Sequence, residues 1–177
     1  MRTSKFFESI FNFLKKRGFL FTIMSIIDEN DRLVISKKVE GEDALLYSNG
    51  VDYGVIPEGV NFEPMLARDI SEKDQDFILK GKVVDKSFIA TDVVYHGEFM
   101  ANKPWHERYL DLKKGFSYTP SIRMSGSIVV EGGEEIVDAA KAFSVSPHFE
   151  GVFVEGYDSD LYDERVFISP EELEELE

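Results

Sequence analysis

The stretch of this chain that decides the fold reads Lys37-Lys38-Val39-Glu40-Gly41-Glu42-Asp43-Ala44-Leu45-Leu46-Tyr47. The apolar segment Leu33-Val34-Ile35 leads into Lys38, a spacer residue, a carboxylate and a glycine, and a second apolar segment follows at once. A lysine at the end of a strand becomes a nucleophile when its surroundings lower its pKa. The glycine lets the backbone approach a bulky ligand closely. Many surface turns also fit this Lys-x-acid-Gly string, so a catalytic and a purely structural interpretation both stand.

The composition predicts one folded domain with a short appendage. The chain has 177 residues, of which 43% are hydrophobic and 13% aromatic, enough to build a core. The net charge of −14 argues against a broad phosphate-binding surface, although a nucleotide pocket needs only a few local cations. The chain has no cysteine, which excludes disulfides, thiolate catalysis and cysteine-based zinc sites.

The first 27 residues differ in charge from the rest of the chain. They carry a net charge of +4, so the remaining residues carry −18. Residues 4–17 place five apolar side chains at helical spacing, which predicts an amphipathic helix that docks on the core, on a partner protein or on a membrane surface. The apolar run 18–27 is too short to span a membrane and no cleavage site follows it. We therefore expect no transmembrane segment and a cytoplasmic location.

The order of the remaining elements predicts an α+β fold of mainly antiparallel sheets with a few flanking helices. A first hairpin is expected over 19–27 and 33–38, and a second over 44–48 and 51–56 around Asn49-Gly50. Further strands are expected at 77–84, interrupted at Gly81, and at 87–95, 121–130 and 149–154. Helices are expected near 63–70 and over 104–114 and 134–143, and Ser169 is expected to cap a last helical turn.

Four segments in this order resemble the nucleotidyltransferase (adenylation) domain of ATP-dependent DNA and RNA ligases and mRNA capping enzymes. They are Lys38-Val39-Glu40-Gly41, Phe88-Ile89-Ala90-Thr91-Asp92-Val93-Val94-Tyr95, Trp105-His106-Glu107-Arg108-Tyr109-Leu110 and Phe149-Glu150-Gly151-Val152-Phe153-Val154. The resemblance covers residues 30–168.

The resemblance implies roles for individual residues. Lys38 would attack the α-phosphate of ATP and form a lysine–AMP phosphoramide, next to Glu40 and Gly41 in the nucleotide site. Phe88 would stack on the adenine, and Glu150 would help to hold Mg²⁺ or Mn²⁺. Simpler interpretations remain beside these, because an aromatic residue on an apolar strand usually belongs to a core and Glu150 can be an exposed strand-end acid. A buried Asp92 needs hydrogen-bond partners and is either structural or part of a site.

The chain also departs from the family pattern at four places. Glu42-Asp43 stands where the family has an arginine, Lys80-Gly81-Lys82 stands for Asp-Gly-Glu, Glu155 replaces a lysine, and only Arg165 is cationic after Lys141. A carboxylate about 4 Å from a phosphate is repelled by roughly several kcal/mol at an effective dielectric constant near 20. Lys80 and Lys82 can reach phosphates, but their charge has the wrong sign for binding a metal. These changes predict weak nucleotide binding.

We therefore expect a degenerate ligase-like domain that acts as a binding or regulatory subunit and docks a protein partner through its N-terminal helix. The alternative is an active minimal adenylyltransferase or ligase that uses ATP with Mg²⁺ or Mn²⁺. An unrelated acidic α+β protein is the third possibility. The expected division is a helix over 1–18, a nucleotidyltransferase domain over 19–168 without an OB-fold domain, and an acidic tail over 169–177. Nucleic acid is expected to bind only with a partner protein.

Other chemistries fit the sequence less well. The three histidines, His96, His106 and His148, lack the spacing of metal ligands. Three acidic residues near the C-terminus, Asp158, Asp160 and Asp163, are more typical of a solvated loop than of a cation site.

Overall fold

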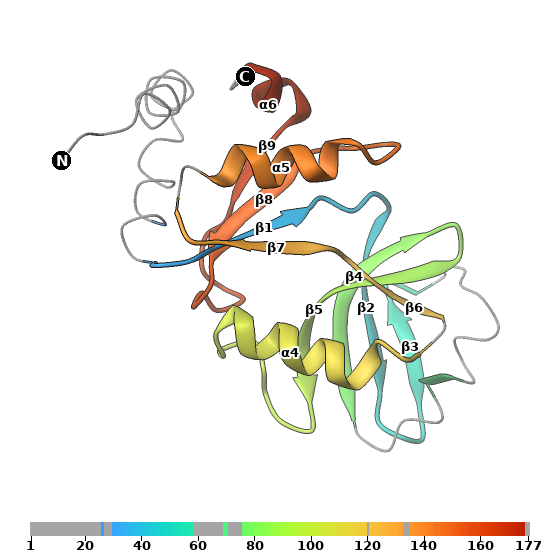
Figure 1. Cartoon of the computed structure of the whole chain (residues 1–177). Coiled ribbons are helices and arrows are strands. Elements are labelled where there is room, and N and C mark those ends of the chain that lie inside the picture. The colour runs from blue at the N-terminus through green and yellow to red at the C-terminus, as the bar shows by residue number, and fades with distance from the viewer. Residues whose placement is uncertain are drawn as a thin grey trace. The chain divides into compact units, whose positions relative to one another are not determined.

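A computed structural model describes residues 26, 30–58, 69–70, 76–119, 121–132 and 135–175 (Figure 1). The chain divides into two compact units. Unit 1 contains Met1–Lys38, Gly126–Ser159 and Asp163–Glu177, and unit 2 contains Val39–Ser125 and Asp160–Tyr162. The predicted N-terminal helix, the predicted strand over 19–27 and most of the helix expected near 63–70 lie outside the described residues.

Unit 1 is built on an antiparallel sheet with the strand order β7-β1-β8-β9. These strands are β1 (Leu33–Lys37), β7 (Ser127–Val130), β8 (Val152–Gly156) and β9 (Val166–Ile168). The described part of the unit also contains the helices α5 (Ile136–Ser144) and α6 (Pro170–Glu175). Alternate strand residues such as Ile35 and Val154 point to one face, where they form a core with helix residues such as Val137 and Leu173.

Unit 2 contains a sheet with the strand order β3-β2-β4-β5-β6. Its strands are β2 (Glu42–Ser48), β3 (Tyr53–Ile56), β4 (Phe77–Val84), β5 (Ser87–His96) and β6 (Ile122–Met124). All neighbours are antiparallel except β5 and β6, which run parallel. Helix α4 (Trp105–Phe116) packs on one face, where the rings of Phe77 and Phe116 meet edge to face at 5.0 Å between centroids.

The predicted α+β class is confirmed, as are most of the expected strands and both longer helices. The predicted cap at Ser169 is also confirmed, because its Oγ accepts a hydrogen bond of 3.1 Å from the backbone N–H of Glu172. Two differences stand out. The stretch 121–130 is not one strand, since β6 belongs to unit 2 and β7 to unit 1. Strand β9 was not predicted, because only three residues of it emerge from an acidic segment.

Gly81 does not interrupt its strand, as the sequence had suggested. Strand β4 runs through it, with a shift in its pairing with β5 between Lys80 and Gly81. A Cβ atom at Gly81 would lie 2.2 Å from the carbonyl oxygen of Ile89 and 2.7 Å from the ring of Phe88. The glycine is therefore required by the close approach of β5 and not by a turn.

The two units are interleaved along the sequence. Residues on both sides of unit 2 in the sequence form the sheet of unit 1. Leu173 of α6, in the segment expected to be an acidic tail, is only 4% exposed and belongs to the core of unit 1.

Candidate active site

Lys38 and Glu150 come together in unit 1. Lys38 directly follows β1, and Glu150 lies two residues before β8, the strand that pairs with β1. The backbone N–H of Lys38 donates a hydrogen bond of 2.9 Å to the carbonyl oxygen of Gly151, which extends this pairing. The Lys38 amine lies 3.6 Å from the Glu150 carboxylate, and the two side chains are 36% and 39% exposed. Two of the segments that carry the resemblance thus meet at one point.

Aromatic rings lie beside this ion pair. The Lys38 amine is 5.0 Å from the ring centroid of Phe167 on β9, and the ring of Phe153 on β8 lies 5.3 Å from that of Phe167. The guanidinium of Arg165 lies over the Phe153 ring at 3.8 Å. In unit 1 the rings of Phe153 and Phe167 thus lie next to each other, with the Lys38 amine against one and the Arg165 guanidinium against the other.

The absence of a side chain at Gly151 allows the Phe167 ring to pack beside it. The Gly151 φ of +115° falls in a region that disfavours other residues, and a Cβ atom there would lie 2.4 Å from the carbonyl oxygen of Ile168 and 2.7 Å from the Phe167 ring. The glycine of the Glu150-Gly151 pair therefore serves close packing against β9. No sequence pattern pointed to Phe167, because β9 is too short to be predicted.

The other predicted site residues belong to unit 2. Glu40 is exposed, and Gly41 has a φ of +115° with the carbonyl oxygen of Val83 only 2.4 Å from where a Cβ atom would lie. Lys82 pairs in register with Asp43 across β2 and β4, and its amine lies 2.6 Å from the Asp43 carboxylate. Two departures from the family pattern, an acid in place of arginine and a lysine in place of glutamate, are thus direct partners.

Phe88 lies in the core of unit 2. Its side chain is fully buried in the core cluster that also contains Leu79 of β4 and Phe116 of α4. With no exposed surface, the ring is not open to a nucleotide in this structure. This placement favours the simpler interpretation of Phe88 as a core residue.

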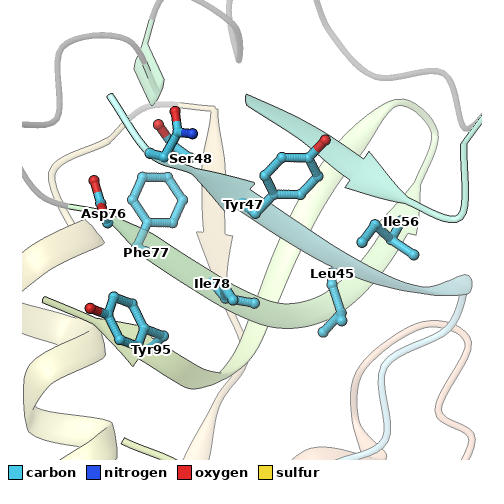
Figure 2. Close-up of a pocket in the computed structure, with 9 residues that line it drawn as sticks. Leu45, Tyr47, Ser48, Ile56, Asp76, Phe77, Ile78 and Tyr95 are labelled. Atoms are coloured by element: carbon cyan, nitrogen blue, oxygen red, sulfur yellow. The ribbon is translucent and has the colours of Figure 1, made fainter. Parts of the chain in front are cut away.

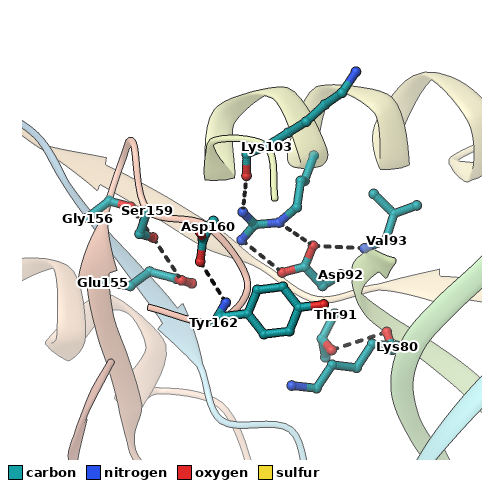
Figure 3. Close-up of polar contacts among 11 residues, drawn as sticks. Lys80, Thr91, Asp92, Val93, Lys103, Glu155, Gly156, Ser159, Asp160 and Tyr162 are labelled. Carbon is teal, nitrogen blue, oxygen red and sulfur yellow. Dashed lines mark hydrogen bonds and ion pairs between the residues drawn. The ribbon is translucent and has the colours of Figure 1, made fainter. Parts of the chain in front are cut away.

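Asp92 is held by a buried arginine. Arg108 on α4 has no exposed side-chain surface, and its Nε and Nη2 atoms donate hydrogen bonds of 2.9 and 3.2 Å to the two carboxylate oxygens of Asp92 (Figure 3). Its Nη1 atom donates to the carbonyl oxygen of Lys103 at 2.5 Å, and Asp92 Oδ1 also accepts from the backbone N–H of Val93 at 2.8 Å. Asp92 is therefore structural, fastening α4 to β5.

Lys103 contributes a separate surface pair. A hydrogen bond from its ammonium to the Glu98 carboxylate, at 2.6 Å, raises the pKa of Lys103 above its ordinary value of 10.5. A pKa that is higher in the folded state stabilises the fold below the ordinary value, and this contribution is lost as the pH rises above 10.5. Both partners are at the surface, so the pair matters little for stability at neutral pH.

No metal cluster is present in the described part of the chain, where no three His, Asp or Glu side chains gather to hold an ion. His96 instead pairs with Asp111 of α4 at 2.9 Å. No helix among the described residues is long and apolar enough to cross a membrane.

Comparison with solved structures identifies the fold of this chain. No family model and no curated protein matches the sequence. Solved structures do match. The ligase domain of M. tuberculosis LigD superposes with a TM-score of 0.53 and 17% identity, over 78% of this chain and 50% of that one. A Lig E DNA ligase, described as binding DNA with a minimal scaffold, gives 0.55 and 12% over 77% and 61%. A structure named Pmar-Lig_Pre gives 0.61 and 16% over 80% and 43%.

This chain has the fold of a DNA ligase domain. It spans about half the length of the solved ligases that it matches. The ligase fold agrees with the resemblance that the four sequence segments carry, and identities of 12 to 17% establish the fold alone.

Proposed function

We propose that this chain is a ligase-like nucleotidyltransferase domain that has lost full nucleotidyl transfer and serves as a binding or regulatory subunit. The ligase fold supports the first part of this proposal. The surroundings of Lys38 support the second part.

The observation that carries the proposal is the ring of Phe167 beside the Lys38 amine. By resemblance, the segment that follows the Glu150-Gly151 strand should bring lysines that grip the phosphates of the nucleotide. That segment is β9, which pairs with β8 and brings a phenylalanine to within 5.0 Å of Lys38. A ring offers no hydrogen-bond donor to a phosphate, so the triphosphate loses the cations that would neutralise it.

The ion pairs point the same way. Glu150, which the resemblance assigns to a metal, lies against the Lys38 amine, and Lys82 is paired with Asp43. ATP would have to compete with a carboxylate for each of these lysines. The remaining cation of the predicted set, Lys80, is half-buried on β4.

An active minimal adenylyltransferase is the second candidate, favoured by the position of Lys38 next to Glu150. Its amine nitrogen would form a bond to the α-phosphorus of ATP while the bond to the bridging oxygen of pyrophosphate breaks, and the amine proton would pass to solvent. Mg²⁺ or Mn²⁺ would neutralise the phosphates when bound. Mycobacterial DNA ligase D has been solved in complex with ATP, which makes ATP the first nucleotide to test.

Incubation with α-³²P-labelled ATP, with Mg²⁺ or Mn²⁺, followed by a denaturing gel tests the proposal. We expect no label on the native chain, because phosphate-binding cations are missing near Lys38. The neighbouring Lys37 donates to Ser146 at 3.0 Å, so Lys37→Ala is a matched control. A label that survives denaturation, persists in Lys37→Ala and is lost in Lys38→Ala would establish the active enzyme instead.

The proposal extends to partners and location. We propose that a protein partner docks on the amphipathic segment 4–17, that nucleic acid is engaged only through such a partner, and that the protein works in the cytoplasm. Deleting residues 1–17 is then expected to abolish assembly with that partner. A deletion that lowers the stability of the isolated chain, measured by thermal unfolding, would instead assign the segment to the core.

A further inference from the structure

A pocket opens on the face of the unit 2 sheet that points away from α4. Its volume is about 350 Å³, and Figure 2 shows its side chains on β2, β3, β4 and β5. Its described apolar and aromatic lining residues are Leu45, Tyr47, Phe77, Ile78 and Tyr95, with Ile56 of β3 at the edge. In the cross-strand register Leu45 faces Ile56, and Tyr47 and Tyr95 flank Ile78, so the pocket follows directly from the sheet.

The polar groups at the rim are largely committed to the turn after β2. The side-chain oxygen of Asn49 accepts from the backbone N–H groups of Val51 and Asp52 at 3.0 and 2.6 Å, and Ser48 Oγ accepts from that of Gly50 at 3.2 Å. The exception is Asp76. Its carbonyl oxygen is fixed by the N–H of Gly97 at 2.9 Å, while no described residue forms an ion pair with its carboxylate.

Among the described residues that line the pocket, Asp76 is the acidic one and none is a lysine or an arginine. These described side chains therefore place one carboxylate beside aromatic walls. Aromatic faces next to a carboxylate attract a planar cation, because the ring and the acid both favour positive charge and the apolar walls accept its stem. Lys80 is the cross-strand neighbour of Leu45. Its positive charge would repel a bound cation from the Leu45 end of the pocket and favour the end near Asp76.

We propose that this pocket binds an arginine side chain of a partner protein. Two features favour a protein segment over a free small cation. Strand β3 is an edge of the described sheet, and its residue Ile56 is 54% exposed. Val51 and Tyr53, just before it, are 85% and 44% exposed, so apolar surface continues outside the pocket for the residues that flank the arginine. An arginine site would give the proposed binding subunit a specific contact with its partner. The inference therefore rests on the proposed role as a binding subunit.

The test uses the full chain with ¹³C-labelled tyrosine rings, titrated with the peptide acetyl-Gly-Leu-Arg-Leu-Gly-amide and followed by NMR. The same peptide with citrulline in place of arginine keeps the shape and removes the charge. We expect the arginine peptide to shift the Tyr47 and Tyr95 signals and to bind about tenfold more tightly than the citrulline peptide, the ratio that an ion pair with the exposed Asp76 and cation–π contacts with the two rings supply together. Equal affinity of the two peptides, or no shift of either ring, would overturn the proposal.

Variants separate the pocket from the general acidity of the chain. Asp76→Asn is expected to weaken the arginine peptide about threefold, as for loss of an exposed ion pair, and to leave the citrulline peptide unchanged. Asp52→Asn removes a nearby acid that does not line the pocket and is expected to change neither. An equal loss in both variants would mean that only overall charge attracts the peptide. The titration is independent of labelling with ATP, so the arginine site and the proposed loss of catalysis can fail separately.

Discussion

Replacing Arg108 with leucine is expected to lower the free energy of unfolding by about 3–5 kcal/mol, the loss typical of breaking a buried ion pair by removing one partner. Arg108 is fully buried, and its removal leaves the Asp92 carboxylate, 14% exposed, with the backbone N–H of Val93 as its hydrogen-bond donor among the described residues. The carbonyl oxygen of Lys103 loses its donor as well. Urea unfolding of the full chain, followed by circular dichroism, measures the change.

Two further variants show whether the loss of stability comes from leaving the Asp92 carboxylate unpaired. Arg123 on β6 is exposed, so Arg123→Leu should change stability by less than about 0.5 kcal/mol. Arg108→Leu combined with Asp92→Asn removes the unpaired charge and should recover part of the loss. If Arg108→Leu were no more harmful than Arg123→Leu, the ion pair would not hold α4 to β5.

The second large effect is expected at Gly81. An alanine there places its Cβ atom against the carbonyl oxygen of Ile89 and the ring of Phe88, at separations that real Cβ atoms do not tolerate. Because β4 is paired on both sides, by β2 and β5, the strands have to move apart to relieve the contact. We expect a loss of about 3 kcal/mol in the free energy of unfolding, at the upper end for overpacking.

Gly132 provides the matched control. A Cβ atom at Gly132 would meet nothing within 4 Å, so Gly132→Ala should be close to neutral. Adding Phe88→Leu to Gly81→Ala removes one of the two clashing groups, and the double variant should lose less than the sum of the single losses. Strict additivity would place the Phe88 ring away from Gly81 and reopen its proposed contact with adenine.

Apolar runs and helical periodicity predicted much of this fold because burial leaves a direct mark on the sequence. The short apolar runs of β2 and β5 and the apolar stripe of α5 are examples. The short strand β9 has only Val166, Phe167 and Ile168, too few residues for a period to be read. Gly81 was misread because a glycine that ends a strand and one that admits a neighbouring strand look alike in sequence.

The site was predictable only in part. Motif order pointed to Lys38 and Glu150, and antiparallel pairing of β1 with β8 brings them together. The contact between Asp43 and Lys82 depends on the register of β2 and β4, which sequence alone does not supply. Which face of β5 carries Phe88 depends on the same kind of information.

The interleaving of the two units sets an order for synthesis. Strand β1 leaves the ribosome first, yet its partners β7 and β8 lie beyond the whole of Val39–Ser125. All five strands of the other sheet are translated in that interval, so they can assemble while β1 still lacks both neighbours. A nascent chain stalled after Ser125 would therefore expose β1, an apolar strand without its two neighbours, to chaperones, and its release from them would mark the arrival of β7 and β8.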